Sequence, residues 1–176
     1  RFRHHIIGYA ALAAVAGAWY FFQLPYSLQF GLLAPAFIAL LYALPLLRGG
    51  RRLRDLHYLK IFLIALVWAW VTVALPALAL SRPLDADLQL LFAERSLFIL
   101  AITIPFDIRD LEIDREGGVR TLPAALGLPR AKALAGAALL AAALLALLCS
   151  FYTDAQRLAL WGSLLPAALV ILYSSP

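Results

Sequence analysis

Residues 131–150 read AKALAGAALLAAALLALLCS, a run in which Lys132 is the one charged residue. A transmembrane helix needs about 20 consecutive, mostly apolar residues to cross the hydrocarbon core of a bilayer. This run has that length and composition. Its small side chains, with Gly136 near the start, allow a neighbouring helix to approach closely. We therefore expect a membrane-spanning helix that is packed on at least one side.

Five more apolar runs have the length of a membrane span or come close to it. Together with the first, the runs are Ile6–Phe22, Leu28–Leu47, Ile61–Leu80, Leu88–Phe106, Ala131–Ser150 and Leu158–Tyr173. Turn residues or charges separate them, and no stretch has the composition of a soluble domain. The sequence predicts an all-α, polytopic transmembrane helix bundle with about six membrane helices, forming a single domain over residues 1–176.

The composition excludes most other classes of protein. Hydrophobic residues make up 64% of the chain and charged residues 14%, whereas soluble domains carry about a quarter charged residues. The mean hydropathy is +0.88. A globule of this size leaves too much surface exposed to hide so many apolar side chains, so lipid must be the solvent for much of the chain. Cys149 is the single cysteine, which rules out an internal disulfide or a cysteine cluster for metal.

The positions of the basic residues indicate how the chain is oriented in the membrane. One set of alternate loops and termini holds most of them, namely Arg1, Arg3, Arg48, Arg51, Arg52, Arg54, Lys60, Arg109, Arg115, Arg120, Arg130 and Lys132. The opposite set holds Arg82 and Arg157. Short basic loops favour the cytoplasmic side of a membrane. This accounts for the net charge of +5 without a nucleic-acid partner. It predicts an integral, multi-pass protein of the bacterial cytoplasmic membrane.

The segment from Asp107 to Gly118 reads DIRDLEIDREGG and is the most acidic part of the chain. If the preceding helix continues through it, Asp107, Asp110 and Asp114 lie at i, i+3 and i+7. At about 100° per residue, these three positions span only about 60° of the helix circumference. The sequence therefore predicts a row of three carboxylates on one face. On the opposite side, Arg109 can pair with Glu112.

A row of carboxylates this close needs a cation, because the charges otherwise repel and raise one another's pKa. Mg²⁺ suits such hard oxygen ligands and completes its shell with water and substrate phosphates. Basic side chains on the same cytoplasmic face of the membrane, Lys60, Arg115 and Arg120, could contact phosphate oxygens. The alternative is a solvated acidic loop with surface ion pairs that contribute little. In either case Gly117 and Gly118 should end the helix.

A longer pattern supports the metal hypothesis. It consists of Asp110-x-x-x-Asp114-x-x-x-Gly118, preceded by Asp107 and followed by Arg120-Thr121-Leu122-Pro123 and Leu126-Gly127. It resembles the second aspartate-rich motif of the UbiA family of membrane prenyltransferases. Tyr42-x-x-Pro45, the arginine-rich loop, Leu59-Lys60 and Val67-Trp68 are also similar to that family. The resemblance covers most of the chain.

The resemblance implies a bundle of nine transmembrane helices around a central cavity. Two aspartate-rich motifs would face each other near the cytoplasmic surface and bind Mg²⁺ together with a prenyl diphosphate. The metal would assist departure of the diphosphate, and a lipophilic or aromatic acceptor would capture the allylic cation. Here Asp107, Asp110 and Asp114 would be metal ligands. Lys60, Arg115 and Arg120 would contact the diphosphate.

The sequence departs from the family in one respect. The first motif, an Asn-Asp-x-x-Asp-x-x-x-Asp pattern, does not occur in these 176 residues. In family order the six runs look like the third to eighth helices. We therefore expect the chain to be a fragment or a divergent member, inactive in prenyl transfer by itself. An inactive homologue that acts as a membrane scaffold or carrier is the alternative function.

Other polar residues admit two interpretations each. Glu94 and Arg95 lie within an apolar run, where charges usually face a cavity or a partner. If that helix begins later, the pair lies near the outer interface instead. The histidines, His4, His5 and His57, are expected to be interfacial anchors, because no cluster with metal-ligand spacing surrounds them. The tryptophans at positions 68 and 70 could line a cavity or pack between helices.

Overall fold

Helices joined by short turns and loops make up the part of the chain that the structure describes. The computed structural model describes residues 3–45, 50, 52–53, 56, 58–118, 120–149 and 154–176, without the side chains of residues 3 and 154–157. In chain order the elements are α1 (Arg3–Gln23), α2 (Tyr26–Ala43), α3 (Leu59–Ala69), the π-helical turn η2 (Trp70–Ala74), α4 (Leu75–Ala79), α5 (Ala86–Arg109), α6 (Leu111–Glu116), α7 (Leu122–Leu126), α8 (Leu128–Leu148) and α9 (Asp154–Tyr173).

The predicted polytopic bundle is confirmed. Five helical segments among the described residues are long and apolar enough to cross a membrane, judged by length and composition: His4–Gln23, Tyr26–Ala43, Leu59–Ala79, Ala86–Arg109 and Leu128–Leu148. The sixth predicted run lies in α9, whose described apolar part, Leu158–Tyr173, is shorter. One boundary was wrong, because the second run was predicted to reach Leu47 and α2 ends at Ala43. Leu44 is extended, as the residue before a proline tends to be.

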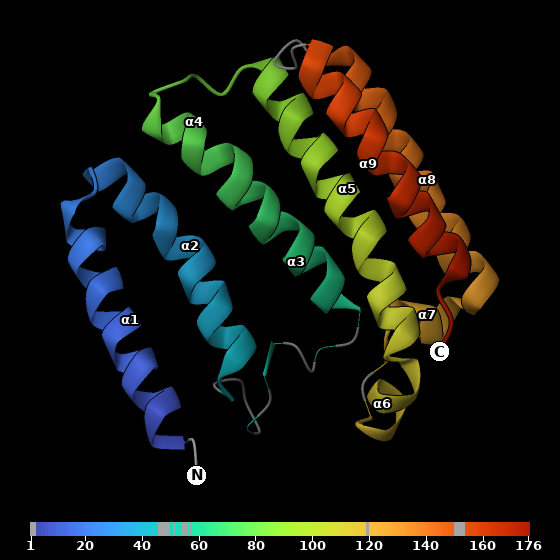
Figure 1. The fold of residues 1–176 in the computed structure, drawn as a ribbon, viewed down its shortest axis with the longest axis horizontal. Coiled ribbons are helices and arrows are strands. Elements are labelled where there is room, and N and C mark those ends of the chain that lie inside the picture. The colour runs from blue at the N-terminus through green and yellow to red at the C-terminus, as the bar shows by residue number, and fades with distance from the viewer. Residues whose placement is uncertain are drawn as a thin grey trace.

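Helix α5 is the centre of the fold (Figure 1). It packs against α3 on one side and against α8, with α9, on the other. The buried core of this unit consists of Ile61, Ala101, Ile104, Ile108, Ala131, Ala135, Ala138, Leu139, Ala167 and Ile171. Six alanines on one side of α8 recur at helical spacing and are nearly inaccessible, namely Ala131, Ala135, Ala138, Ala142, Ala143 and Ala146. The prediction of a closely packed helix in this run is confirmed for residues 131–148, and the helix ends before Cys149, which is extended.

Helix α2 is held against the next span by one polar contact. The indole Nε1 of Trp70 donates a hydrogen bond to the carbonyl oxygen of Gly31 at 2.8 Å. Gly31 lies close to α4, since a Cβ there would come within 2.8 Å of a Leu75 methyl carbon. The wide turn η2 ends at Ala74, two residues before Pro76, which has no N–H to offer the preceding turn. Trp70 therefore has a packing role.

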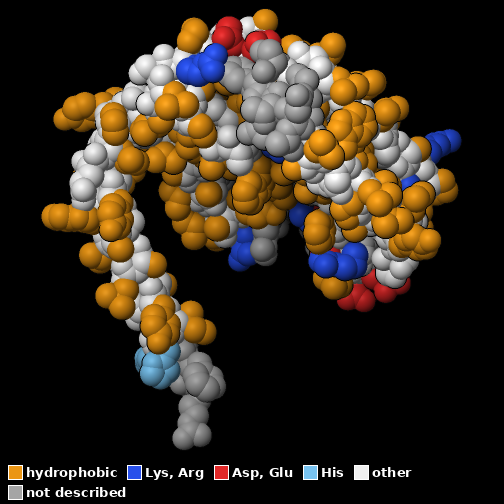
Figure 2. Space-filling view, turned by 45° about the horizontal axis from the view of Figure 1, so that its top comes forward, with side chains coloured by type: hydrophobic (Ala, Val, Ile, Leu, Met, Phe, Trp, Pro, Cys, Tyr) orange, Lys and Arg blue, Asp and Glu red, His pale blue; other side chains and the backbone are white. Residues whose placement is uncertain are grey.

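Helix α1 stands apart from the rest of the chain, joined through its turn into α2 (Figure 1, Figure 2). Every side chain from His4 to Tyr20 is exposed. His4 and His5 lie at its start, as expected of interfacial residues, whereas His57 lies outside the described residues. In Figure 2 apolar side chains cover most of the visible surface, and charged ones gather towards the ends. This is the surface expected of a protein whose solvent is lipid.

Candidate functional site

The candidate site forms where α5 ends. The α-helical hydrogen bonding runs through the junction, because Asp110 N–H donates to Phe106 O and Asp114 N–H donates to Asp110 O, both at 2.9 Å. Asp110 itself has φ −88° and ψ 8°, so the helix bends there before α6 begins. Helix α6 ends at Glu116, and Gly118 has a φ of +70°, which glycine adopts without steric cost. The predicted glycine stop is confirmed.

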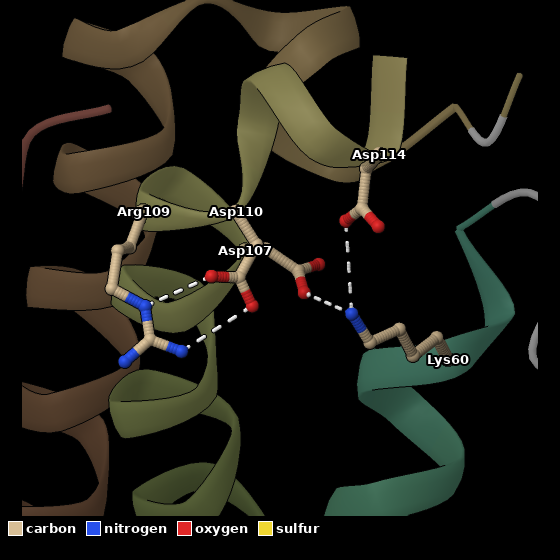
Figure 3. Close-up of polar contacts among 5 residues, drawn as sticks. All are labelled: Lys60, Asp107, Arg109, Asp110 and Asp114. Carbon is tan, nitrogen blue, oxygen red and sulfur yellow. Dashed lines mark hydrogen bonds and ion pairs between the residues drawn. The ribbon is translucent and has the colours of Figure 1, made fainter. Parts of the chain in front are cut away.

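Lys60 lies between two of the three predicted carboxylates. It projects from the first turn of α3, and its Nζ is 3.0 Å from Asp107 Oδ1 and 3.8 Å from Asp114 Oδ2 (Figure 3). The Asp107 side chain is only 3% exposed. Neither carboxylate oxygen accepts a well-aligned hydrogen bond within the described residues, although both are buried. The lysine charge therefore compensates the burial of two carboxylates that come from different helices.

Asp110 faces the other way and pairs with its chain neighbour. Arg109 donates from Nε to Asp110 Oδ1 at 2.9 Å and from Nη2 to Oδ2 at 3.4 Å (Figure 3). Arg109 also lies over the Phe106 ring. The expected pairing of Arg109 with Glu112 was wrong. The single row of three aspartates was also wrong as a geometry, because the bend at Asp110 lets the forked guanidinium hold that carboxylate at the surface.

The hydrogen bond from Arg109 lowers the pKa of Asp110 below its ordinary value, and burial opposes this without cancelling it. A carboxyl with a lowered pKa contributes stability above its unfolded pKa and loses it as the pH falls through the folded pKa. We expect the Asp110 carboxyl to titrate below the ordinary aspartate range. In Arg109→Gln its midpoint should move upward towards that range. Carbon-detected NMR titration of labelled aspartate measures both, and an unchanged midpoint in the variant would contradict the assigned cause.

Of the three predicted phosphate contacts, the structure brings two close to Asp107. A small cavity of about 10 Å³ is lined by Leu56, Tyr58, Lys60, Ile61, Asp107, Arg120 and Thr121. The Tyr58 N–H donates to the Arg120 carbonyl oxygen at 3.3 Å, which ties the loop after α6 to the start of α3. Arg115 is exposed on α6 and does not line this cavity. The volume suits about one water molecule, so the cavity in this form is too small for a diphosphate.

The sequence did not single out Thr121 as a site residue. It is 3% exposed, and its buried Oγ1 has no hydrogen-bond partner within the described residues. It precedes α7 without capping that helix through its side chain. The available signal was its place in Arg120-Thr121-Leu122-Pro123. That pattern indicated the family resemblance and assigned no role to the Thr121 hydroxyl.

The residues present fit a hard cation in part. Asp107 and Asp114 offer two buried oxygen atoms that face one point, and Mg²⁺ is commonly bound through one or two protein carboxylates. Among the described residues, no group of three or more His, Cys, Asp or Glu side chains is arranged around one metal position. The assignment of Asp107, Asp110 and Asp114 as magnesium ligands stays a prediction.

Apolar cavities lie alongside the span that carries Lys60. One of about 170 Å³ lies between α2 and α3 and is lined by residues that include Tyr42, Val67 and Trp68. Another, of about 210 Å³, is lined by residues that include Val67, Trp70 and Phe92. Both predicted roles of the tryptophans therefore occur. Trp68 lines a cavity, whereas Trp70 lines a cavity and also packs against α2. The apolar lining of the two cavities is suited to a hydrocarbon chain.

Glu94 and Arg95 are separate from this site. Helix α5 begins at Ala86, where the Asp85 side chain accepts a hydrogen bond from Leu88 N–H, so the idea that the helix starts later was wrong. Glu94 is fully buried, and Arg95 Nη2 lies 3.7 Å from its Oε2. Thirteen residues of helix separate Glu94 from Asp107, which is about 20 Å along the axis.

Comparison with known families gives one match, in which residues 3–175 correspond to the UbiA prenyltransferase family. No curated protein matches the chain. No solved structure matches it.

Proposed function

The chain belongs to the UbiA prenyltransferase family, and from this premise we propose that it takes part in transfer of an isoprenoid chain from a prenyl diphosphate to a lipophilic or aromatic acceptor. The family match supports a prenyltransferase-type function in a multi-pass membrane protein. One observation carries the finer proposal. It is the cluster of Lys60, Asp107 and Asp114 at the end of two membrane spans, beside apolar cavities.

Each part of the cluster suits one part of a prenyl diphosphate. When bound, Mg²⁺ would neutralise charge on the diphosphate and make it a better leaving group. Asp107 and Asp114 would hold the metal, with Asp110 joining them after releasing Arg109. Lys60 and Arg120 would contact phosphate oxygens as charge develops on them, and Arg115 is a weaker candidate because it points to solvent. The same end of the bundle would face the cytoplasm.

The apolar cavities would receive the isoprenoid tail. Their walls are mainly hydrocarbon and aromatic side chains from α2, α3, η2 and α5, which exclude the water that would attack an allylic cation. Trp68, Trp70 and Tyr42 line these cavities, and aromatic rings can stabilise a nearby cation. The tail would thus extend from the charged cluster into the bilayer part of the bundle.

The test is protection of the purified protein against thermal unfolding by a prenyl diphosphate. We expect protection that requires Mg²⁺ and that is lost in Asp114→Asn. A ligand that binds the folded protein stabilises it, and tighter binding stabilises it more. Asp87→Asn is the matched control, since Asp87 lies near the start of α5 at the opposite end of the bundle. Unchanged protection in Asp114→Asn would contradict the proposal.

A second function is favoured by one feature of the sequence. The 176 residues contain no Asn-Asp-x-x-Asp pattern, so the chain supplies one of two expected aspartate motifs. A homologue that binds prenyl lipids as a carrier or scaffold would keep the cluster without catalysis. Magnesium-dependent protection without turnover of prenyl diphosphate and acceptor would favour this alternative.

A further inference from the structure

We propose that Lys60 is a built-in substitute cation, which occupies the metal position between Asp107 and Asp114 in the free protein and is displaced to the phosphates when metal and diphosphate bind. This inference rests on the proposed function, because it deepens the role of the same carboxylates. It assigns Lys60 two positions, of which the structure shows the first.

The geometry of the first position supports a substitute rather than an ordinary surface ion pair. The ammonium contacts one oxygen on each of two carboxylates that come from α5 and α6. Both of these oxygens are buried and accept no well-aligned hydrogen bond within the described residues. A cation shared between two otherwise unsatisfied carboxylate oxygens takes the place that a divalent ion would take.

Lys60 can leave this position without unfolding its helix. It lies in the first turn of α3, two residues after Tyr58, whose backbone is in the left-handed region with φ 62°. Its side chain is 25% exposed, so a route to solvent exists. The adjoining cavity is lined in part by Arg120, which is an exposed residue. A lysine that swings towards this side would lie near a second basic residue, an arrangement that favours phosphate.

The exchange is also favoured by charge. Two carboxylates and one ammonium leave the cluster with one net negative charge, so a metal ion is still attracted. A divalent ion next to Lys60 would repel the ammonium. The displaced ammonium then becomes available to the diphosphate that arrives with the metal. The free protein would thus bind metal alone weakly and bind metal with diphosphate strongly.

The first test uses the unaltered protein. Lys60 and Lys132 are the two lysines of the chain, and Lys132 donates to the Leu172 carbonyl oxygen, away from the carboxylates. Acylation of each lysine by an amine-reactive reagent is followed by mass spectrometry. We expect saturating Mn²⁺ alone to raise the labelling of Lys60 relative to Lys132 several-fold. Inorganic pyrophosphate added with Mn²⁺ should lower it again. An unchanged ratio with bound Mn²⁺ would overturn the inference.

The second test compares variants by their affinity for Mn²⁺. A nearby cation changes the proton affinity of a carboxylate by about 10- to 1000-fold, so Lys60→Met should bind Mn²⁺ at least about tenfold more tightly. Lys132→Met is the matched control and should bind as the unaltered protein does. Equal or weaker binding by Lys60→Met, with Asp114-dependent binding retained in the parent, would overturn the inference and leave the metal site standing. Absence of Asp114-dependent Mn²⁺ binding in both proteins would overturn the metal site as well.

Discussion

Replacing Lys60 by methionine is expected to lower the free energy of unfolding by about 3 kcal/mol at pH 7 in metal-free buffer. Asp107 is 3% exposed and has Lys60 within 3.0 Å, so the substitution leaves a buried carboxylate without its cation. Removal of one partner of a buried pair is far more damaging than removal of both. Thermal or denaturant unfolding in detergent measures the difference.

A double-mutant cycle separates the charge effect from the loss of the lysine stem. Lys60→Met combined with Asp107→Asn should recover most of the lost stability, because both buried charges are then gone. Lys132→Met provides the control for loss of a lysine at the same end of the bundle. If the double variant is as unstable as Lys60→Met alone, the ion pair is not what stabilises this junction.

Substitution of Ala135 by leucine is expected to destabilise the protein by about 2 kcal/mol. Ala135 is fully buried in the core of the unit formed by α5, α8 and α9. Small residues let membrane helices approach closely, and a leucine at this position would push α8 away from α5. Since α5 carries Asp107, the displacement should also weaken any binding at the carboxylates.

The matched control is Ala137→Leu. Ala137 lies on the same helix and is exposed, so the added side chain would meet lipid or detergent. The free energy of unfolding of this variant should stay within about 0.5 kcal/mol of the parent value, as for most surface substitutions. Equal destabilisation by the two substitutions would show that α8 is sensitive to its composition rather than to contact with α5.

The spans could be predicted from sequence because their cause is local. A run such as residues 131–150 must satisfy its backbone groups within itself in a bilayer, and only a helix does so. The end of α2 was placed too late, because apolar composition continues through Leu44 and Pro45 although the backbone cannot stay helical before a proline. The hydropathy of a run indicates that it lies in lipid, whereas the proline determines where the helix ends.

The candidate site could be predicted only in part, for a related reason. Spacing identified the aspartates, and the shared basic side of the membrane identified Lys60 and Arg120 as cations near them. The contact of Lys60 with Asp107 joins residues 47 positions apart, so it depends on how α3 packs against α5. The turning of Asp110 towards Arg109 depends on a bend of one residue, which a uniform helix of about 100° per residue cannot represent.

Helix α1 has a consequence for how the protein responds to its membrane. Its 21 residues make a rod of about 30 Å, the thickness of the hydrocarbon core. Helix α5, by contrast, is fixed by neighbours on both sides. When the bilayer thins or thickens, a helix adapts most easily by tilting, and α1 can tilt without disturbing the carboxylate cluster. Hydrophobic mismatch would therefore be absorbed at the periphery of the chain, while the depth of Asp107 in the membrane stays constant.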